Sequence, residues 1–163
     1  MDLVHRIVAV DFDGTLCENC FPDCGKEIKV NYKLKNGEII SVTLIDILRF
    51  LQVNGHQLIL FTCRQGEALI NAVKWCKERH LEFDAVNDDV EATYLWYAPT
   101  EQDKANLSAK RKIFAHVYID DRNLGVSKVF KNGITLDDEL ISELGIPFGE
   151  GEKFMKKVVS LYA

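Results

Sequence analysis

The feature that most constrains this chain is a short apolar run that ends in two carboxylates, in the stretch VAVDFDGTL over residues 8–16. The β-branched residues of the run are typical of a buried strand in a parallel sheet. Asp11 and Asp13 follow at its carboxyl end, where open α/β sheets bind their ligands, and Gly14 and Thr15 allow a tight turn. Two close carboxylates repel unless a cation or a proton lies between them, and hard oxygen ligands suit Mg²⁺. The stretch therefore predicts a magnesium site, against the plainer alternative of a polar strand end that caps a turn.

Three further stretches follow in a fixed order along the chain. LILFT over residues 58–62 is an apolar run ending in Thr62, Lys112 precedes the next apolar run, and VYIDD over residues 117–121 ends in Asp120 and Asp121. Together with the first stretch, this order resembles that of the haloacid dehalogenase superfamily of phosphohydrolases. The resemblance covers about residues 6–125.

The resemblance implies a fold, a reaction and a cofactor. The fold would be α/β, with a Rossmann-like, doubly wound parallel sheet. The reaction would be hydrolysis of a phosphomonoester through an aspartyl phosphate on Asp11, with Mg²⁺ held by Asp11, Asp120 and the backbone carbonyl of Asp13. Asp121 would bind the ion through water or orient its other ligands. The side chain of Asp13 would protonate the leaving group and then activate water.

The resemblance also implies how the phosphate is held. Thr62 would donate a hydrogen bond to a phosphate oxygen, and Lys112 would pair with the phosphate, although Lys110 is an alternative. Arg64 is placed either to reach a second phosphate or a sugar oxygen, or to pair with Glu67 at the surface. The residues expected to contact substrate are Gly14, Thr15, Cys63 and Arg64.

The connection after the first strand, about residues 17–42, is long for a βα loop, which typically has about two to six residues. Residues 28–34 alternate between apolar and polar, and Asn36-Gly37 is a typical two-residue hairpin turn. The insert is too small for a helical cap domain. We therefore expect a β-hairpin flap over the active site, with a surface hairpin that takes no part in catalysis as the alternative.

The rest of the chain alternates between helical and strand patterns, which predicts one α/β domain over residues 1–163. Thr43 and Asp46 form an imperfect capping box for the helix that follows the insert. Residues 88–106 are polar with several aromatics, so they either line the substrate pocket or pack as a structural loop. The other expected elements are helices at about 67–79, 108–112, 137–144 and 152–162, and short strands at 83–86 and 129–130.

Composition and charge limit the partners. The formal net charge is −5 and no basic run is present, so nucleic acid is not expected as an obligate partner, although a nucleic-acid end is a possible substrate. No apolar run is long enough to span a membrane, and the first residues do not form a signal peptide, so we expect a cytoplasmic protein. The expected partner is a phosphorylated small molecule, and no obligate protein partner is evident.

Three alternatives compete with these interpretations. Cys17, Cys20 and Cys24 are spaced as in some zinc sites, but we favour free thiols because a fourth ligand would have to come from far away. A receiver domain also uses an aspartyl phosphate, yet its acidic pair comes earlier in the chain than Asp120 and Asp121. The remaining alternative to an enzyme is a non-catalytic or regulatory phosphate-binding module on the same fold.

Overall fold

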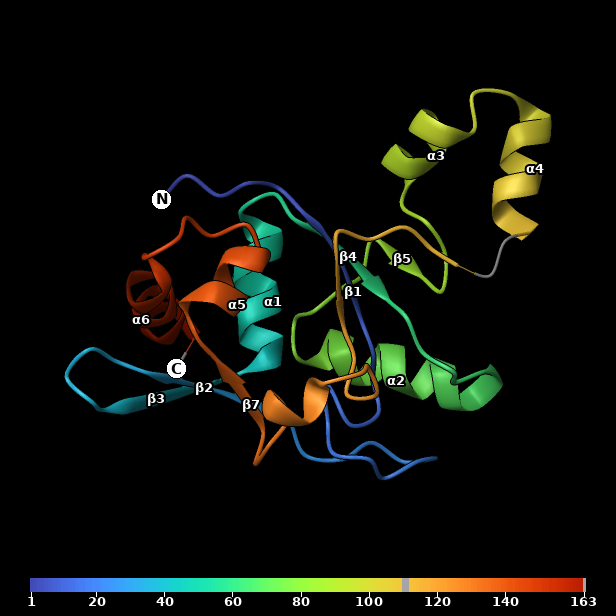
Figure 1. The fold of residues 1–163 in the computed structure, drawn as a ribbon. Helices are drawn as coiled ribbons and strands as arrows, with labels where there is room; N and C mark the ends of the chain where they lie inside the picture. Colours follow the sequence, from blue (N-terminus) through green and yellow to red (C-terminus); the bar gives the residue numbers. More distant parts are fainter. Residues whose placement is uncertain (110–111, 163) are drawn as a thin grey trace.

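The computed structural model describes residues 1–109 and 112–162. Its centre is a parallel sheet of four strands in the order β5-β4-β1-β6 (Figure 1). The strands are β1 (Ile7–Val10), β4 (Gln57–Leu60), β5 (Ala85–Val86) and β6 (Val117–Ile119). The α/β fold and the parallel sheet expected from the sequence are confirmed, and β1, with a strand on each side, is buried along its whole length.

The two faces of the sheet are covered differently. Val8 and Val10 of β1 lie in the main hydrophobic core, which also includes side chains of α1 (Leu44–Val53) and α2 (Gly66–Glu78). Ile7 and Ala9, which alternate with them, lie in a small second cluster with side chains that precede α3 and β6. Thr43 caps α1 as expected, because its hydroxyl accepts a hydrogen bond of 3.1 Å from the backbone N–H of Asp46.

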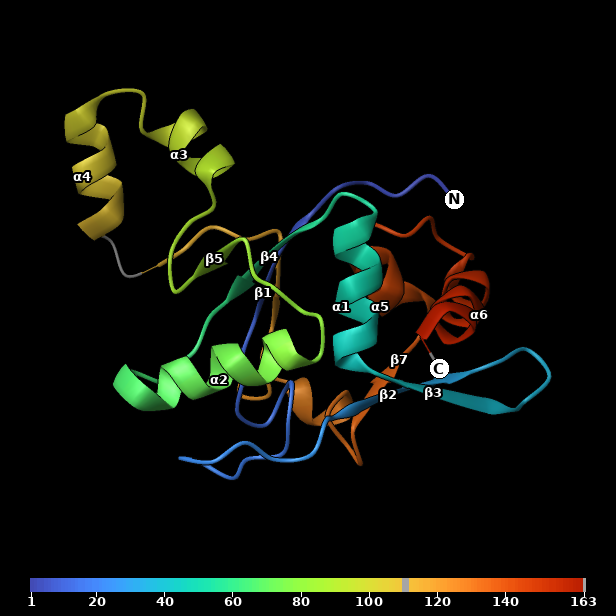
Figure 2. The same cartoon turned by 180° about the vertical axis from the view of Figure 1, so that it is seen from behind.

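The insert after β1 does contain the expected hairpin. Strands β2 (Lys29–Lys33) and β3 (Ile39–Thr43) pair antiparallel, and the turn between them includes Gly37 at a φ of +91°. The hairpin belongs to a second sheet, because β2 also pairs in parallel with β7 (Ile134–Leu136). Figure 1 and Figure 2 show this small mixed sheet beside α6 (Gly151–Tyr162), with the turn pointing away from the end of β1.

The hairpin therefore differs from the flap that the sequence suggests. Its alternating apolar side chains are buried in the main core rather than turned toward an open site: Val30, Tyr32, Leu34 and Val42. The tip is fixed to α6, since the backbone N–H of Lys35 donates to Glu152 Oε2 at 2.8 Å. The physical reason is β7, which supplies a strand partner that local alternation in residues 28–34 cannot reveal.

This placement predicts what removal of the hairpin does. A fully buried apolar side chain contributes roughly 1.5–3 kcal/mol, against about 5–15 kcal/mol for a whole domain. Replacing residues 29–42 by a short Gly-containing loop removes four such side chains and the partner of β7. We expect the shortened chain to lose cooperative thermal unfolding by circular dichroism. A chain with Asn36 changed to Asp serves as control, and a near-native midpoint for the shortened chain would contradict the role in the core.

The remaining segments are placed as follows. Residues 88–106 include two helices, α3 (Glu91–Tyr97) and α4 (Glu101–Ala109), which stand out at the opposite end of the sheet from the carboxyl end of β1 (Figures 1 and 2). No helix begins at Ser108, because α4 already ends at Ala109, and Lys110 lies outside the described residues. The expected strand at 129–130 is replaced by a 3₁₀ turn, η1 (Val126–Lys128), followed by β7. The chain then forms α5 (Asp138–Glu143) before α6.

Among the residues that the structure describes, no helix is long and apolar enough to cross a membrane.

Candidate active site

Three carboxylates meet at the carboxyl edge of the parallel sheet. Strands β1 and β6 pair with Val10 opposite Ile119, so the next residue of each strand, Asp11 and Asp120, comes out side by side. The backbone N–H of Asp11 donates to the carbonyl of Ile119 at 2.9 Å and continues the pairing one residue further. One carboxylate oxygen from each of Asp11, Asp120 and Asp121 lies within 4.8 Å of the other two. The sequence stretches at residues 8–16 and 117–121 therefore form one acidic cluster.

This cluster fits a divalent metal. Asp121 Oδ1 is buried and has no hydrogen-bond partner, which is unfavourable for a carboxylate oxygen unless a cation binds it. Three carboxylates converging on one point provide the hard oxygen ligands that Mg²⁺ prefers. Gly14, at a φ of +81°, lies directly against the carboxylate of Asp121, and a Cβ at this position would collide with it. Gly14 therefore makes room for a ligand side chain.

The pKa of Asp11 reflects the burial and the mutual repulsion of the carboxylates in the cluster. Burial raises its pKa from 3.8 to about 7, and the neighbouring charges of Asp120 and Asp121 add to this, while the backbone N–H of Phe12 works in the opposite direction. Without a cation the cluster therefore holds a proton on Asp11 up to neutral pH. A bound cation would favour the charged form that a nucleophile or a metal ligand requires.

Asp13 does not join the three carboxylates, because its side chain is held by Arg64. The guanidinium donates from Nε to Asp13 Oδ2 at 2.8 Å and from Nη2 to Asp13 Oδ1 at 2.7 Å, a bidentate ion pair. The carboxyl group of Asp13 still lies beside the cluster, at the edge of the hollow in front of it, and is 20% exposed. The carboxylate of Asp13 is thus next to the acidic cluster, and the two hydrogen bonds from Arg64 fix the orientation of both of its oxygens.

The opening in front of the cluster is a hollow of about 260 Å³, which we call the mouth. Thr62 and Cys63, which follow β4, line it. The Thr62 hydroxyl accepts a hydrogen bond of 3.1 Å from the backbone N–H of Arg64, so its own O–H remains available as a donor. The mouth is lined by Asp11, Asp13, Asn19, Phe61, Thr62, Cys63, Asp120 and Arg122.

Three expected contact residues have other positions. Thr15 is fully buried, and its hydroxyl accepts the backbone N–H of Asp121 at 3.2 Å. The backbone N–H of Gly14 donates to the carbonyl of Cys17 at 2.8 Å, so the turn itself uses this donor. Lys112 does not line the mouth but a separate hollow with Asp89 and other residues. Lys112 precedes β6, so the chain brings it to the amino end of that strand.

Sequence reasoning missed several residues around the mouth. Arg122 directly follows the pair Asp120-Asp121, and its backbone N–H donates to Asp120 Oδ1 at 2.9 Å. Asn19 comes from the segment before the hairpin. Asn87 Oδ1 accepts a hydrogen bond of 2.8 Å from the backbone N–H of Thr62 and so holds the end of β4. Arg122 could have been predicted to line the mouth, because it directly follows the acidic end of β6. No local sequence pattern indicates this position for Asn19.

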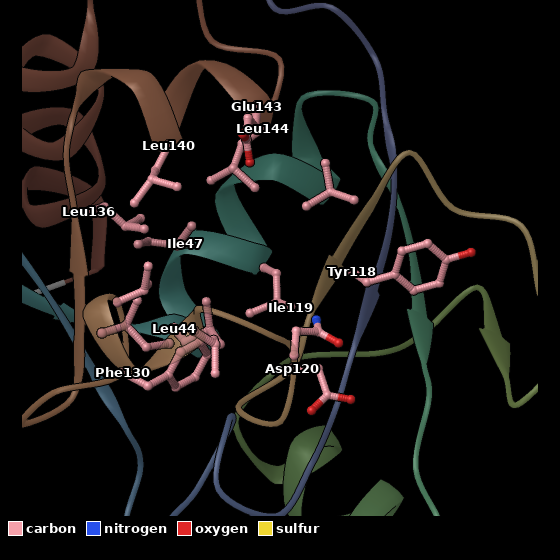
Figure 3. A pocket seen from close by; sticks show the side chains of 15 residues that line it. Leu44, Ile47, Tyr118, Ile119, Asp120, Phe130, Leu136, Leu140, Glu143 and Leu144 are labelled. Atoms are coloured by element: carbon pink, nitrogen blue, oxygen red, sulfur yellow. The ribbon is translucent and has the colours of Figure 1, made fainter.

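Two other features lie close to the cluster but differ in chemistry. Asp121 and Gly14 also border a second open hollow of about 710 Å³, where Lys29 brings the base of the hairpin near the acidic residues. A small apolar pocket of about 150 Å³ lies between β6, α1, α5 and β7, with Asp120 at its edge. Figure 3 shows Leu44, Ile47, Leu136 and Leu140 around it, with Tyr118 turned away. Its lining is mainly apolar, so it does not suit a phosphate.

The cysteines do not form a metal centre in the described residues. The acidic triad is the one group of His, Cys, Asp or Glu side chains within residues 1–109 and 112–162 with a geometry that could hold an ion. Cys17, Cys20 and Cys24 are not in disulfides. Burial raises the pKa of Cys17 to about 11, which keeps this thiol protonated at neutral pH.

Comparison with known proteins gives one informative match. A solved structure described as that of a conserved protein from Bacteroides thetaiotaomicron is 33% identical over 98% of this chain and 99% of that chain, with a TM-score of 0.55. No family model matches the chain, and no curated protein matches it. The description of the Bacteroides protein states no activity, so the function has to be argued from the site.

Proposed function

This chain belongs to the same family as the conserved Bacteroides thetaiotaomicron protein, and we propose that it is a magnesium-dependent phosphohydrolase acting through an aspartyl phosphate on Asp11. The observation that carries the proposal is the convergence of Asp11, Asp120 and Asp121, with Asp13 and Thr62 at the mouth. These residues come from motifs whose order resembles that of the haloacid dehalogenase superfamily, to which we assign the chain as part of this proposal.

Each residue of the site has a separate role in the proposed reaction. A carboxylate oxygen of Asp11 attacks phosphorus, the bond from phosphorus to the leaving oxygen breaks, and the proton for that oxygen comes from Asp13. Asp13 then accepts a proton from water, whose oxygen attacks the phosphorus of the aspartyl phosphate. The bond from phosphorus to the Asp11 oxygen breaks, which releases inorganic phosphate and restores the Asp11 carboxylate. Thr62 donates its hydroxyl to a phosphate oxygen. Mg²⁺ held by Asp11, Asp120 and Asp121 would offset the repulsion between these carboxylates and the phosphate.

The phosphate also needs a cationic side chain, and we assign this part to Arg122. Arg122 lines the mouth beside Asp120, whereas Lys112 lines a different hollow. Guanidinium groups bind phosphate oxygens in a bidentate manner. We expect Arg122→Met to lower kcat/KM by about 10²-fold, in the range of a lost charge-assisted hydrogen bond pair. The matched variant Lys112→Met should stay within about threefold, and the reverse result would return the role to Lys112.

The proposed function is tested by a phosphatase screen of the wild-type protein. The panel contains nucleotides, sugar phosphates and 3′-phosphorylated oligonucleotides, because an open mouth of about 260 Å³ suits either a phosphorylated small molecule or a nucleic-acid end. We expect magnesium-dependent release of inorganic phosphate from at least one class. Magnesium binding without turnover across the whole panel would instead favour a non-catalytic phosphate-binding module.

A further inference from the structure

Arg64 is the most completely engaged side chain at the mouth. Its side chain is only 1% exposed, yet the guanidinium carries a full charge. All of its N–H groups have acceptors within hydrogen-bond distance. Nε donates to Asp13 Oδ2 at 2.8 Å, Nη2 to Asp13 Oδ1 at 2.7 Å and Asp23 O at 2.6 Å, and Nη1 to Pro22 O at 3.0 Å and Ala68 O at 3.2 Å. No N–H is left for a substrate phosphate or a sugar oxygen, and the partner is Asp13 rather than Glu67.

The faces of the guanidinium are also in contact. Its central carbon lies 4.6 Å from the ring centre of Phe12 and 5.3 Å from that of Phe21. Such stacking, together with the planar fork of donors, is possible for arginine but not for lysine. The position therefore requires the shape of arginine as well as its charge.

The acceptors of Arg64 come from three parts of the chain. Asp13 follows β1, the carbonyls of Pro22 and Asp23 belong to the segment of residues 19–24, and Ala68 lies in the first turn of α2. We call residues 19–24 the mouth loop, because Asn19 at its start lines the mouth. Arg64 is thus the common partner of the proton-transfer carboxylate, a loop at the opening, and a helix of the core.

We propose that Arg64 is a positioning residue that fixes the carboxylate of Asp13 and the mouth loop in a single arrangement in front of the acidic cluster. Proton transfer depends on a carboxyl oxygen within hydrogen-bond reach of the leaving oxygen, and a displacement of about 1 Å can cost about 10²-fold in rate. The catalytic part of this inference rests on the proposed function. The structural part, the hold on the mouth loop, does not.

The catalytic part is tested by a double-mutant cycle with Arg64→Met, Asp13→Asn and both changes together, using p-nitrophenyl phosphate with Mg²⁺. We expect Arg64→Met to lower kcat by about 10²-fold with KM and the Mg²⁺ dissociation constant within about threefold, since the acidic cluster is untouched. Asp13→Asn alone should lower kcat by about 10²–10⁴-fold. In the Asp13→Asn background, the added change Arg64→Met should lower kcat by less than about threefold further, because its effect on the reaction passes through Asp13. An equal loss from Arg64→Met in both backgrounds would overturn the assignment.

Arg79 provides a matched control. It also makes an ion pair, with Glu27 at 3.0 Å, and stacks on Trp75 at 3.8 Å, but it lies at the far end of α2 and does not touch Asp13. Arg79→Met should leave kcat within about threefold. If Arg64→Met does not fold, Arg64→Lys takes its place in the cycle, because lysine keeps the charge without the fork. It should still lose at least about tenfold in kcat, and wild-type kcat in Arg64→Lys would equally overturn the proposal.

The hold of Arg64 on the mouth loop can be tested without measuring enzymatic activity. Cys24 in the mouth loop is partly buried, with its sulfur 4.0 Å from Arg64 Nη1, while Cys20 in the same loop is exposed. Alkylation with N-ethylmaleimide, located by peptide mass spectrometry, should label Cys24 at least about tenfold faster in Arg64→Met than in wild type or Arg79→Met. Cys20 is the internal reference. An unchanged rate at Cys24 would show that Arg64 does not hold the loop, whatever the outcome of the phosphatase screen.

Discussion

Asp11→Asn should abolish phosphatase turnover, with a loss of about 10⁴-fold or more in kcat, as for removal of a covalent nucleophile. The physical reason is that an amide oxygen is a far weaker nucleophile than a carboxylate, and the substitution leaves the size of the side chain unchanged. Steady-state kinetics on the best substrate of the screen measures the loss. Asp2→Asn, at an exposed position before β1, is the control.

The same substitution should make the metal-free protein more stable. The pKa of Asp11 is about 7 in the folded protein against an ordinary value of 3.8, so between these pH values the folded state binds more protons than the unfolded state. The free energy of unfolding therefore falls as pH rises from about 4 to about 7, and the loss is complete above pH 7. One pKa unit corresponds to about 1.4 kcal/mol, and partial solvent contact reduces the effect, so we expect a gain of about 1–2 kcal/mol at pH 7.5 for Asp11→Asn.

Urea unfolding of both proteins in EDTA, at pH 5 and at pH 7.5, measures this gain. The advantage of Asp11→Asn should be largest at pH 7.5 and smaller at pH 5, where Asp11 of the wild type is already protonated. A variant that keeps wild-type turnover, or one that is less stable than wild type at pH 7.5, would contradict the role of Asp11 as a strained and reactive carboxylate.

Removal of the metal should have an equally large effect. Chelation with EDTA should abolish turnover, and added Mg²⁺ should restore it, because three carboxylates and a phosphate cannot approach one another without a cation. Mg²⁺ should also raise the midpoint of thermal unfolding of the wild type, since the ion binds only the folded cluster. Asp120→Asn and Asp121→Asn should each weaken this stabilisation, whereas Asp13→Asn should not, because its side chain is held by Arg64.

The pH dependence of Mg²⁺ binding follows from the same carboxylate. Below pH 7 the ion must displace a proton from Asp11, so its apparent affinity should fall by up to about tenfold for each pH unit from 7 to 5. Above pH 7 the affinity should level off. Isothermal titration calorimetry in buffers of different ionisation enthalpy measures both the affinity and the released proton. Full turnover in a metal-free preparation, or an affinity that does not change between pH 5 and pH 7, would contradict the site.

The parts of this structure that were predictable from sequence are those set by local pattern and strand order. Asp11 and Asp120 could be brought together because both end apolar runs, and parallel neighbouring strands place such ends at one edge. The turn at Asn36-Gly37 and the cap at Thr43 were predictable because short-range backbone chemistry determines them.

The parts that were missed depend on contacts between distant segments. Arg64 lies 51 residues from Asp13, so no periodicity or motif links them. The hairpin appeared free to act as a flap because its partner, β7, comes about a hundred residues later and has only a short strand pattern. Lys112 was predicted from its place before the apolar run that ends in Asp120, but order along the chain does not fix direction in space, and Lys112 lines another hollow.

The most direct test of the central claim is to trap and locate the phosphoenzyme. Wild-type protein is mixed with substrate and Mg²⁺, quenched in acid and reduced with borohydride, which converts an aspartyl phosphate to homoserine. Peptide mass spectrometry then locates the product. We predict homoserine at position 11, increased in Asp13→Asn because hydrolysis of the intermediate is slowed, and absent from Asp11→Asn. Turnover of substrate without homoserine at position 11, or with homoserine at Asp13, Asp120 or Asp121 instead, would contradict the account.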